Sequence, residues 1–454
     1  MESTPIVREC EVTTEEAVVS TLSPWRILWI WIVIGVQSFG GGMSESRKRE
    51  MIVRARTIVT MDGSPIKNGA VAVSGDRIVD VGKFDQIKTR NSGAVADLGE
   101  QVLLPGLINA HCHLDYTCLR GKIARQKSFT GWIHAINAEK SALSPENYVA
   151  SINKGFAEAK GFGTTTIANL TAFPELIRQL PEPPIRTWWF AELIDVRSPD
   201  RTNELVDSAV ESLKSEQNYG LAPHALFTAS KNLYQRCEEA GENVLLTTHL
   251  AESREEMEMF RDVSGPLYKF MKSIGRPMDD CGGKTPLEVF TGAPSASPAR
   301  TGRALPQWII AHLNELTESD FELLKKMKTK FHVVHSPRSH RYFGHSRFPF
   351  QRLHALGFNV CLGTDSLASN ESLSWFAEMR AFQRNEPDIS PANIFEMVTL
   401  NPASALRQQN TLGRVRPGFR ADLIAIPCAD DDDLFEEIVA FDGEINWMMV
   451  NGKP

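Results

Sequence analysis

Five of the eleven histidines in this 454-residue chain stand where short apolar runs end: His111, His113, His224, His249 and His312. The first two form a His-x-His pair, and alternate residues of a strand share one face, so both imidazoles point to one side. Glu252 and Asp365 follow two of the other runs. Several imidazoles with a carboxylate and an open position suit Zn²⁺, and such sites also accept Fe²⁺. These residues indicate a metal centre that activates water, because a bound metal lowers the pKa of water to about 7.

The elements that must position these residues alternate between apolar strands and longer helical stretches, which is typical of parallel βα units. Helices are expected over 145–160, 201–215, 252–273 and 318–328. Eight strands are predicted, the number that closes a TIM barrel of about 250 residues, whose active site lies at the carboxyl ends of the strands. They are 103–110, 164–169, 187–193, 220–224, 244–249, 308–313, 331–335 and 359–363.

The sequence of the fourth predicted strand indicates how many metal ions the site holds. Barrel hydrolases with two metals commonly bridge them through a modified lysine on this strand, and Leu221–Leu226 contains no lysine. We therefore expect one divalent metal, with Zn²⁺ as the first candidate and Fe²⁺ as the alternative.

Short strands separated by turns occur before and after the barrel region, over 51–60, 70–73 and 77–81 and again over 421–426 and 447–450. They predict a small β-sandwich domain built from both chain ends, residues 43–104 and 405–454. The metal-dependent (β/α)8 barrel then occupies residues 105–404. The fold class is α/β.

Residues 1–42 are left unassigned. Trp25–Val36 is strongly apolar, but a spanning helix needs about 20 such residues. The acidic residues around it do not fit a secretory signal. We expect a natural start at Met43 and no membrane partner, with an interfacial anchor as the alternative if the segment is real.

Charge and cysteine content narrow the function classes. The chain has 49 Lys+Arg against 56 Asp+Glu, a formal net charge of −7, so no basic stripe is available for nucleic acid. Its seven cysteines are odd in number and include no Cys-x-x-Cys pair, which argues against a disulfide scaffold or a cysteine zinc site. We expect a cytoplasmic protein that acts on a small molecule, with a homo-oligomer possible.

Five segments carry a resemblance to a known family: 105–114, with Pro-Gly-Leu-Ile-Asn-Ala-His-Cys-His-Leu, then 223–225, 248–253, 311–313 and 362–366. In this order they resemble the signatures of the amidohydrolase superfamily, in its chlorohydrolase and adenosine-type deaminase branch. That branch includes deaminases of S-adenosylhomocysteine, methylthioadenosine, aminodeoxyfutalosine, guanine and cytosine. The resemblance runs from about Met51 to Pro454 and implies one metal bound by His111, His113, His249 and Asp365.

The resemblance also implies a division of catalytic roles in a hydrolase of carbon–nitrogen bonds other than peptide bonds, of the cyclic amidine deaminase type. Glu252 would protonate a ring nitrogen while hydroxide attacks the adjacent amino-bearing carbon. Asp365 would carry the water proton to the leaving ammonia, and His312 would orient the hydroxide. This division is chemically sensible, because the ring resists attack until its nitrogen is protonated. A carboxylate at the position of Glu252 could also serve the N-terminus of a helix.

Four residues are expected to bind the substrate. His224 matches the family position that hydrogen-bonds the base, and Glu139 stands near the position of an acid that binds the sugar or tail, although its register after Trp132 is shifted. The segment Ser336–His340 departs from the family pattern. There Arg338 or Arg341 could clamp a carboxylate or phosphate, with His340 beside them. Equally, these arginines could lie on a surface loop.

The predicted reaction is deamination of a purine-like or related aminated heterocycle, such as an adenosine-type nucleoside. Two alternatives to it stay open. The same metal chemistry could remove chloride or cleave another carbon–nitrogen bond. A catalytically inactive scaffold would have lost metal ligands or the acid, and none is lost here.

Overall fold

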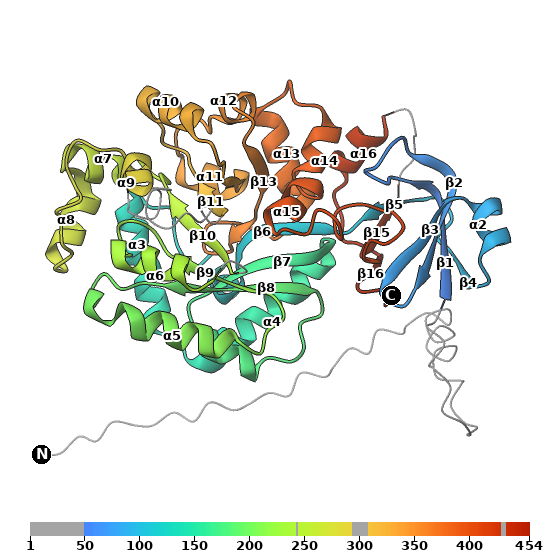
Figure 1. Cartoon of the computed structure of the whole chain (residues 1–454), viewed down its shortest axis with the longest axis horizontal. Coiled ribbons are helices and arrows are strands. Elements are labelled where there is room, and N and C mark those ends of the chain that lie inside the picture. The colour runs from blue at the N-terminus through green and yellow to red at the C-terminus, as the bar shows by residue number, and fades with distance from the viewer. Residues whose placement is uncertain (1–49, 242–243, 293–306, 428–432) are drawn as a thin grey trace, which may run out of the picture. The chain divides into compact units, whose positions relative to one another are not determined.

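The computed structural model describes residues 50–241, 244–292, 307–427 and 433–454 (Figure 1), which belong to a compact unit formed by Lys48–Pro454. The expectations for residues 1–42, including the start at Met43, lie outside the described residues. No helix among the described residues combines the length and the apolar character that crossing a bilayer requires.

A nine-stranded sheet whose pairs are all parallel carries the centre of the fold, in the order β13-β12-β11-β10-β9-β8-β7-β6-β14. β14 follows β13 after only two residues and pairs with β6, with Asp365 opposite Cys112. β13 and β14 therefore act as one interrupted eighth strand that returns to the first, and the fold fits a TIM-like barrel. The bounds are β6 (Leu107–His113), β7 (Thr164–Thr171), β8 (Arg186–Leu193), β9 (Tyr219–Pro223), β10 (Leu245–Leu250), β11 (Trp308–His312), β12 (His332–His335), β13 (Asn359–Leu362) and β14 (Asp365–Ser366).

Alternation along the strands separates two apolar layers. On β7, Ala168 and Leu170 pack in a cluster with residues of most other barrel strands, whereas Ile167 packs in the cluster that includes helix residues such as Phe156. Both faces of these strands are thus covered, which explains why they read as nearly continuous apolar runs rather than as alternating ones.

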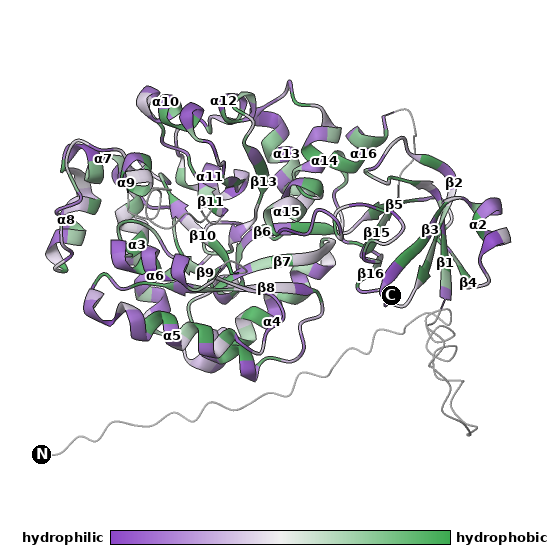
Figure 2. Ribbon diagram, in the orientation of Figure 1, coloured by the Kyte–Doolittle hydropathy of each residue, from purple (hydrophilic) through white to green (hydrophobic). Residues whose placement is uncertain are grey.

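Helices follow the strands and present one apolar side to them. Figure 2 shows α4 and α5 with both hydrophobic and hydrophilic residues, as expected for helices that cover a sheet and face water. The helices are α3 (Phe129–Ser141), α4 (Pro145–Gly161), α5 (Thr202–Leu213), α6 (Lys231–Glu239), α7 (Arg254–Asp262), α8 (Gly265–Ser273), α9 (Pro286–Gly292), α10 (Glu318–Lys326), α11 (Pro337–Phe343), α12 (Phe350–Ala355), α13 (Trp375–Asn385), α14 (Pro391–Glu396) and α15 (Leu400–Ala405).

The helix predicted over 252–273 is two helices, α7 and α8. Val263 ends α7 in the left-handed conformation with φ 53°, and Gly265 and Pro266 begin α8. Pro266 has no amide hydrogen and cannot continue the hydrogen-bonding ladder of α7, so the chain restarts there.

A second sheet contains strands from both ends of the described chain, in the order β16-β15-β5-β1-β2-β3 with β4 on β1. β15 pairs antiparallel with β5, with Leu423 opposite Pro105. Both ends thus share one sheet, as predicted, whereas a sandwich of two sheets is not confirmed. The domain boundaries of 43–104, 105–404 and 405–454 stay predictions. The elements are β1 (Glu50–Ile58), β2 (Ile66–Ser74), β3 (Arg77–Lys83), α2 (Phe84–Arg90), β4 (Ala94–Asp97), β5 (Gln101–Pro105), β15 (Leu423–Pro427), α16 (Leu434–Ala440) and β16 (Trp447–Met449).

The first strand predicted for the barrel, 103–110, is divided between the two sheets. Its first part belongs to β5 and its second to β6, with Gly106 between them. A Cβ at Gly106 would lie 2.2 Å from the Thr165 side chain, so this close passage between the sheets requires glycine.

Candidate metal centre and active site

Three barrel strands bring the predicted metal ligands together. His111 and His113 end β6, His249 lies near the end of β10, and Asp365 begins β14. Nε2 of His113 lies 3.3 Å from Nε2 of His249 and 3.9 Å from Oδ1 of Asp365. Nε2 of His111 lies 3.8 Å from the same oxygen. Three imidazoles and one carboxylate therefore direct donor atoms into one small volume.

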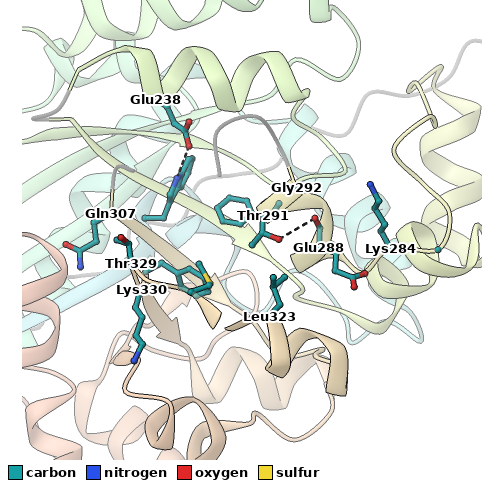
Figure 3. A pocket seen from close by; sticks show the side chains of 14 residues that line it. Glu238, Lys284, Glu288, Thr291, Gly292, Gln307, Leu323, Thr329 and Lys330 are labelled. Atoms are coloured by element: carbon teal, nitrogen blue, oxygen red, sulfur yellow. Dashed lines mark hydrogen bonds between the residues drawn. The ribbon is translucent and has the colours of Figure 1, made fainter. Parts of the chain in front are cut away.

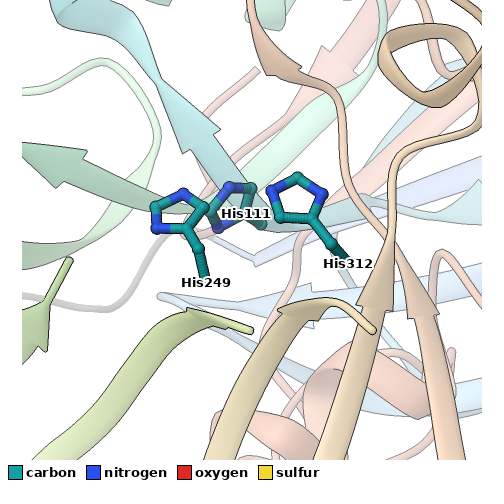
Figure 4. A group of neighbouring side chains, drawn as sticks. All are labelled: His111, His249 and His312. Atoms are coloured by element: carbon teal, nitrogen blue, oxygen red, sulfur yellow. The ribbon is translucent and has the colours of Figure 1, made fainter. Parts of the chain in front are cut away.

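The chemistry of these donors fits a divalent cation. In Figure 4 the rings of His111, His249 and His312 lie together, and the nearest ligand atoms of these three side chains are within 4.8 Å of one another. A second such group comprises His111, His113 and Asp365. His111 is fully buried, yet neither ring nitrogen has a hydrogen-bond partner. An unpaired buried imidazole is costly unless something binds it, which a metal ion would do.

Neighbouring groups set which ring nitrogen of His249 is available. Its Nδ1 lies 2.7 Å from the carbonyl oxygen of His224. A carbonyl only accepts hydrogen bonds, so Nδ1 carries the proton and donates it. The lone pair of Nε2 is then free to face His113, as a metal ligand requires.

Burial keeps the imidazoles neutral. It lowers the pKa of His111 and His312 well below the usual value, and the nearby His249 lowers both further. Only a neutral imidazole has a lone pair for a metal, so the electrostatics of the site favour the binding form.

Hydrogen bonds fix Asp365 in place. Oδ1 accepts from the backbone N–H of Ser366 at 2.8 Å, and Oδ2 accepts from the hydroxyl of Ser339 at 2.6 Å. The backbone of Asp365 has φ 56°, a left-handed conformation that is strained for a non-glycine residue. Strain of this kind is commonly held at functional sites, and here it interrupts the eighth strand at the ligand itself.

Glu252 lies beside this cluster as a buried acid. Burial raises its pKa well above the ordinary value, and the charges of Asp365 and Glu256 raise it further. Its Oε1 lies 3.7 Å from Nε2 of His312. The backbone N–H of Glu252 donates to the carboxylate of Glu256 at 2.8 Å, and the side-chain amide of Asn314 donates to its carbonyl. The segment before α7 therefore holds a buried carboxyl group whose surroundings favour its protonated form.

A cavity of about 640 Å³ opens onto these groups. His224 lines its reactive part, and so do five of the other predicted site residues: His113, His249, Glu252, His312 and Asp365. Its wider part is largely apolar, with Tyr116, Phe129, Trp132, Ile133, Ile136, Phe227, Phe270, Met271, Ile274 and Phe343. The cavity therefore combines hydrophobic walls with a polar cluster at one end, as is usual for small-molecule sites.

Three of the four residues expected to bind substrate lie elsewhere. Glu139 is not among the described residues that line this cavity, whereas the next residue, Lys140, is. Arg338 donates hydrogen bonds to the carbonyl and hydroxyl of Ser372 and to the carboxylate of Glu371. Nε2 of His340 lies 2.8 Å from the carbonyl oxygen of Ser346. Nothing in these contacts tests their roles, which stay predictions.

Glu192 is a site residue that the sequence prediction missed. It lies near the end of β8, is 9% exposed and lines the cavity. Its Oε1 has no hydrogen-bond partner and lies 3.6 Å from Nδ1 of His113. The only signal in the sequence was an acid at the end of the third predicted strand, which carries no motif.

A second cavity, of about 570 Å³, lies at the opposite ends of the barrel strands (Figure 3). Trp308, which begins β11, and Phe331, which precedes β12, line it. Glu238 accepts a hydrogen bond from the Trp308 indole. None of the described His, Cys, Asp and Glu groups that could hold a metal lies there, so this cavity has no evident part in hydrolysis.

Comparison with known proteins agrees with this geometry. The model of the amidohydrolase family matches residues 102–454. The chain is 28% identical over 403 residues to a 5-methylthioadenosine/S-adenosylhomocysteine deaminase of Nitratidesulfovibrio vulgaris, covering 84% of each chain.

Two solved structures share the fold. Helicobacter pylori aminofutalosine deaminase, in complex with methylthio-coformycin, superposes with a TM-score of 0.77 at 20% identity and covers 89% of this chain and 99% of its own. An adenosine deaminase from Xanthomonas campestris with bound zinc gives 0.70 at 21% identity, covering 89% and 92%. Because the family model matches residues 102–454, the chain belongs to the amidohydrolase family.

Proposed function

We propose that this protein is a metal-dependent hydrolase that deaminates a purine-like or related aminated heterocycle, such as an adenosine-type nucleoside. One observation carries the proposal: a buried carboxyl group with a raised pKa, Glu252, lines the same cavity as the converging donors of His113, His249 and Asp365. The relative named as a deaminase of methylthioadenosine and S-adenosylhomocysteine supports the substrate class.

His111, His113, His249 and Asp365 would hold one divalent metal, Zn²⁺ first and Fe²⁺ as the alternative. When bound, such a metal would lower the pKa of a water to about 7 and supply a nucleophile at neutral pH. Support for zinc comes from the imidazole-rich donor set and from a structural relative that contains it.

Glu252 would act as the general acid. Because burial raises the pKa of this carboxyl group, its protonated form is favoured and can donate a proton to a ring nitrogen of the substrate. Protonation withdraws electrons from the adjacent amino-bearing carbon and makes attack by water possible.

Asp365 and His312 would manage the water and its proton. His312 stacks on His249 with ring centroids 5.3 Å apart and would orient the nucleophile. Asp365 would accept one proton from the water and pass it to the leaving amino group, and the second water proton would return to Glu252 as the carbonyl forms. One water and one amino group then become one carbonyl and one ammonia, and the proton that Glu252 donated stays on the ring nitrogen. The bonds from Ser339 and Ser366 hold the carboxylate of Asp365 in position for this transfer.

Glu192 would position a ligand. Its carboxylate faces Nδ1 of His113 at 3.6 Å. If Nδ1 carries the proton, Nε2 is left with its lone pair toward the other donors. A carboxylate behind a ligating imidazole is a common arrangement that orients the ring and fixes the tautomer.

The cellular setting is proposed from the cysteines. Cys112, Cys118, Cys237, Cys281 and Cys361 are free thiols, which suits a reducing cytoplasm. Action on a small molecule is supported by the cavity beside the metal ligands and by the relative named as a 5-methylthioadenosine/S-adenosylhomocysteine deaminase. A homo-oligomer, a two-sheet sandwich and the absence of nucleic acid as a partner stay predictions.

A panel assay tests the proposed activity. Ammonia release would be measured with adenosine, S-adenosylhomocysteine, methylthioadenosine, aminodeoxyfutalosine, guanine and cytosine. We expect the highest kcat/KM with an adenosine-type nucleoside. A metal-loaded enzyme that releases ammonia from none of them would contradict deamination. Chloride release from a chlorinated triazine would then favour the dechlorination alternative.

A further inference from the structure

A third cavity, separate from the reactive one, lies between α11 and the end of α13. It has a volume of about 500 Å³ and shares no lining residue with the reactive cavity. Its polar lining comprises three histidines and three arginines together with Asn385 and Glu386: His335, His340, Arg341, His345, Arg347 and Arg384. We call it the imidazole–arginine pocket.

The charges in this pocket are not balanced. Glu386 is buried, and both of its oxygens are occupied: Oε1 accepts from Arg347 at 3.0 Å and Oε2 from Gln351 at 3.2 Å. Arg341 and Arg384 are exposed, and within the described part of the chain neither guanidinium group has a hydrogen bond or an ion pair. Two guanidinium groups are thus left without a counter-charge at one cavity.

The imidazoles add unsatisfied polar atoms. His335 is 2% exposed, and its Nδ1 has no hydrogen-bond partner. Nε2 of His345 is likewise buried and unpaired. Burial lowers the pKa of His345 to about 3, so this ring is neutral at pH 7 and has one N–H to donate. Buried polar atoms without partners call for a water or a ligand.

Aromatic packing holds two of these rings in place. His335 stacks on Phe348 with ring centroids 3.9 Å apart and an angle of 5°, and His345 stacks on Phe343 at 5.1 Å. The pocket is therefore a built cavity with fixed donors, and not only a group of mobile surface arginines.

The three imidazoles do not form a metal site. Among the described residues, the groups whose ligand atoms converge within 4.8 Å include none of His335, His340 and His345. Unpaired guanidinium groups would also repel a cation. Both facts favour an anion with several acceptor oxygens.

We propose that the imidazole–arginine pocket binds a phosphate group, held by Arg341 and Arg384 and by N–H groups of the buried imidazoles. Guanidinium forks match the oxygens of phosphate, and charge-assisted hydrogen bonds of this kind are the strong ones. The site lies outside the reactive cavity, so it is distinct from the reacting part of any substrate. The ligand is either free phosphate or the phosphate of a nucleotide.

Calorimetric titration of the full, metal-loaded chain with inorganic phosphate at constant ionic strength tests this site. We expect saturable binding to one site, and a dissociation constant raised about tenfold or more in the double variant Arg341→Gln, Arg384→Gln. The matched control is Arg201→Gln, Arg261→Gln, which removes the same charge from two exposed arginines that line none of the three cavities described here. The control should bind phosphate like the wild type.

Two results would overturn the proposal. One is no saturable binding of millimolar phosphate by the wild type, which would mean that the cavity holds only water. The other is equal weakening in both double variants, which would reveal a general effect of net charge.

A second variant tests the imidazoles without removing charge. His345→Phe keeps a ring that can stack on Phe343 but removes the ring nitrogens. We expect weaker phosphate binding at an unchanged midpoint of thermal unfolding, and unchanged affinity would exclude this imidazole from the site. Competition with adenosine 5′-monophosphate identifies the source: displacement of phosphate at lower concentration indicates a nucleotide, and no displacement indicates the free ion.

Discussion

At the scale of single residues, the proposed chemistry depends on two carboxyl groups that lie in different surroundings. Burial and two neighbouring acids raise the pKa of Glu252. Asp365, by contrast, accepts hydrogen bonds from Ser366 and Ser339. Two acids in different surroundings can thus act as proton donor and proton acceptor in one site.

Replacing Glu252 by Gln separates catalysis from metal binding. We expect the variant to retain one metal per chain while kcat falls by about 10²-fold or more, the range of a general acid. His249→Ala and Asp365→Ala should reduce both metal content and activity. Elemental analysis and ammonia release would be measured on all three variants. Metal loss in Glu252→Gln would make Glu252 a ligand, and two metals per active chain would contradict the single-metal prediction.

A second expectation at this scale concerns Glu192. Glu192→Leu removes the acceptor that faces His113 and should weaken metal affinity by about 10- to 100-fold. Glu192→Gln keeps a side-chain oxygen and should retain most of the affinity. Competition with a chromogenic chelator measures this directly, without any assay of turnover. Equal affinities in the two variants would show that the carboxyl group does not act through His113.

At the scale of elements, Glu378 on α13 connects two helices. It accepts a hydrogen bond from the backbone N–H of Arg338 at 3.0 Å, at the start of α11, and another from Asn370 at 2.6 Å. Burial raises the pKa of Glu378 to about 7, whereas an unfolded glutamic acid has a pKa of about 4.3. The folded protein therefore holds this proton more tightly, and the associated stability is present below pH of about 4 and is lost as the pH rises through about 7.

The pH dependence of the free energy of unfolding tests whether Glu378 makes the protein less stable as the pH rises. Between pH 5 and pH 8 the loss of this proton should lower the free energy of unfolding of the wild type by about 1–3 kcal/mol relative to that of Glu378→Gln. Urea denaturation at several pH values measures both. Glu204→Gln, on the exposed surface of α5, is the control and should follow the wild type. A parallel fall in Glu378→Gln and the wild type would contradict the assignment.

The passage from β5 to β6 gives a further expectation. Gly106→Ala places a Cβ against Thr165 in the buried junction, and such overpacking costs about 1–3 kcal/mol. Gly161→Ala is a suitable control, because a Cβ there meets only Glu444 at 3.9 Å. Denaturant unfolding of both variants measures the difference. Equal stability would mean that the junction adjusts without cost.

These elements also show what the sequence can and cannot predict. The His-x-His spacing and the positions of His249 and Asp365 at the ends of predicted strands indicated that these side chains lie together. The reason is that the carboxyl ends of parallel strands meet at one edge of the sheet. The division of 103–110 between two sheets was not predicted, since both parts are apolar and only the close approach at Gly106 separates them. Glu192 was missed because an isolated acid has no spacing signal. The position of Arg338 depends on Glu371 and Ser372, whose proximity no local pattern reveals.

At the scale of the whole molecule, the strand pattern of the sequence and the described part of the structure agree on the first strand. It was expected from Met51, and β1 begins at Glu50. We expect a chain that lacks residues 1–42 to be soluble, to bind metal and to release ammonia like the full chain. Gel filtration, metal analysis and the panel assay compare the two. Loss of activity or of folding in the shorter chain would show that the segment belongs to the functional structure.

The interrupted eighth strand has a consequence for how the protein is made. Asp365 lies directly opposite Cys112, between the two histidines of the first barrel strand. Contacts between such distant parts of a chain form slowly during folding, and a structural metal site rarely exists before folding. A ribosome must therefore release most of the polypeptide before a complete set of metal donors can assemble. The metal would then bind only after the barrel has closed. A chain that ends before Asp365 would lack one of the four proposed donors.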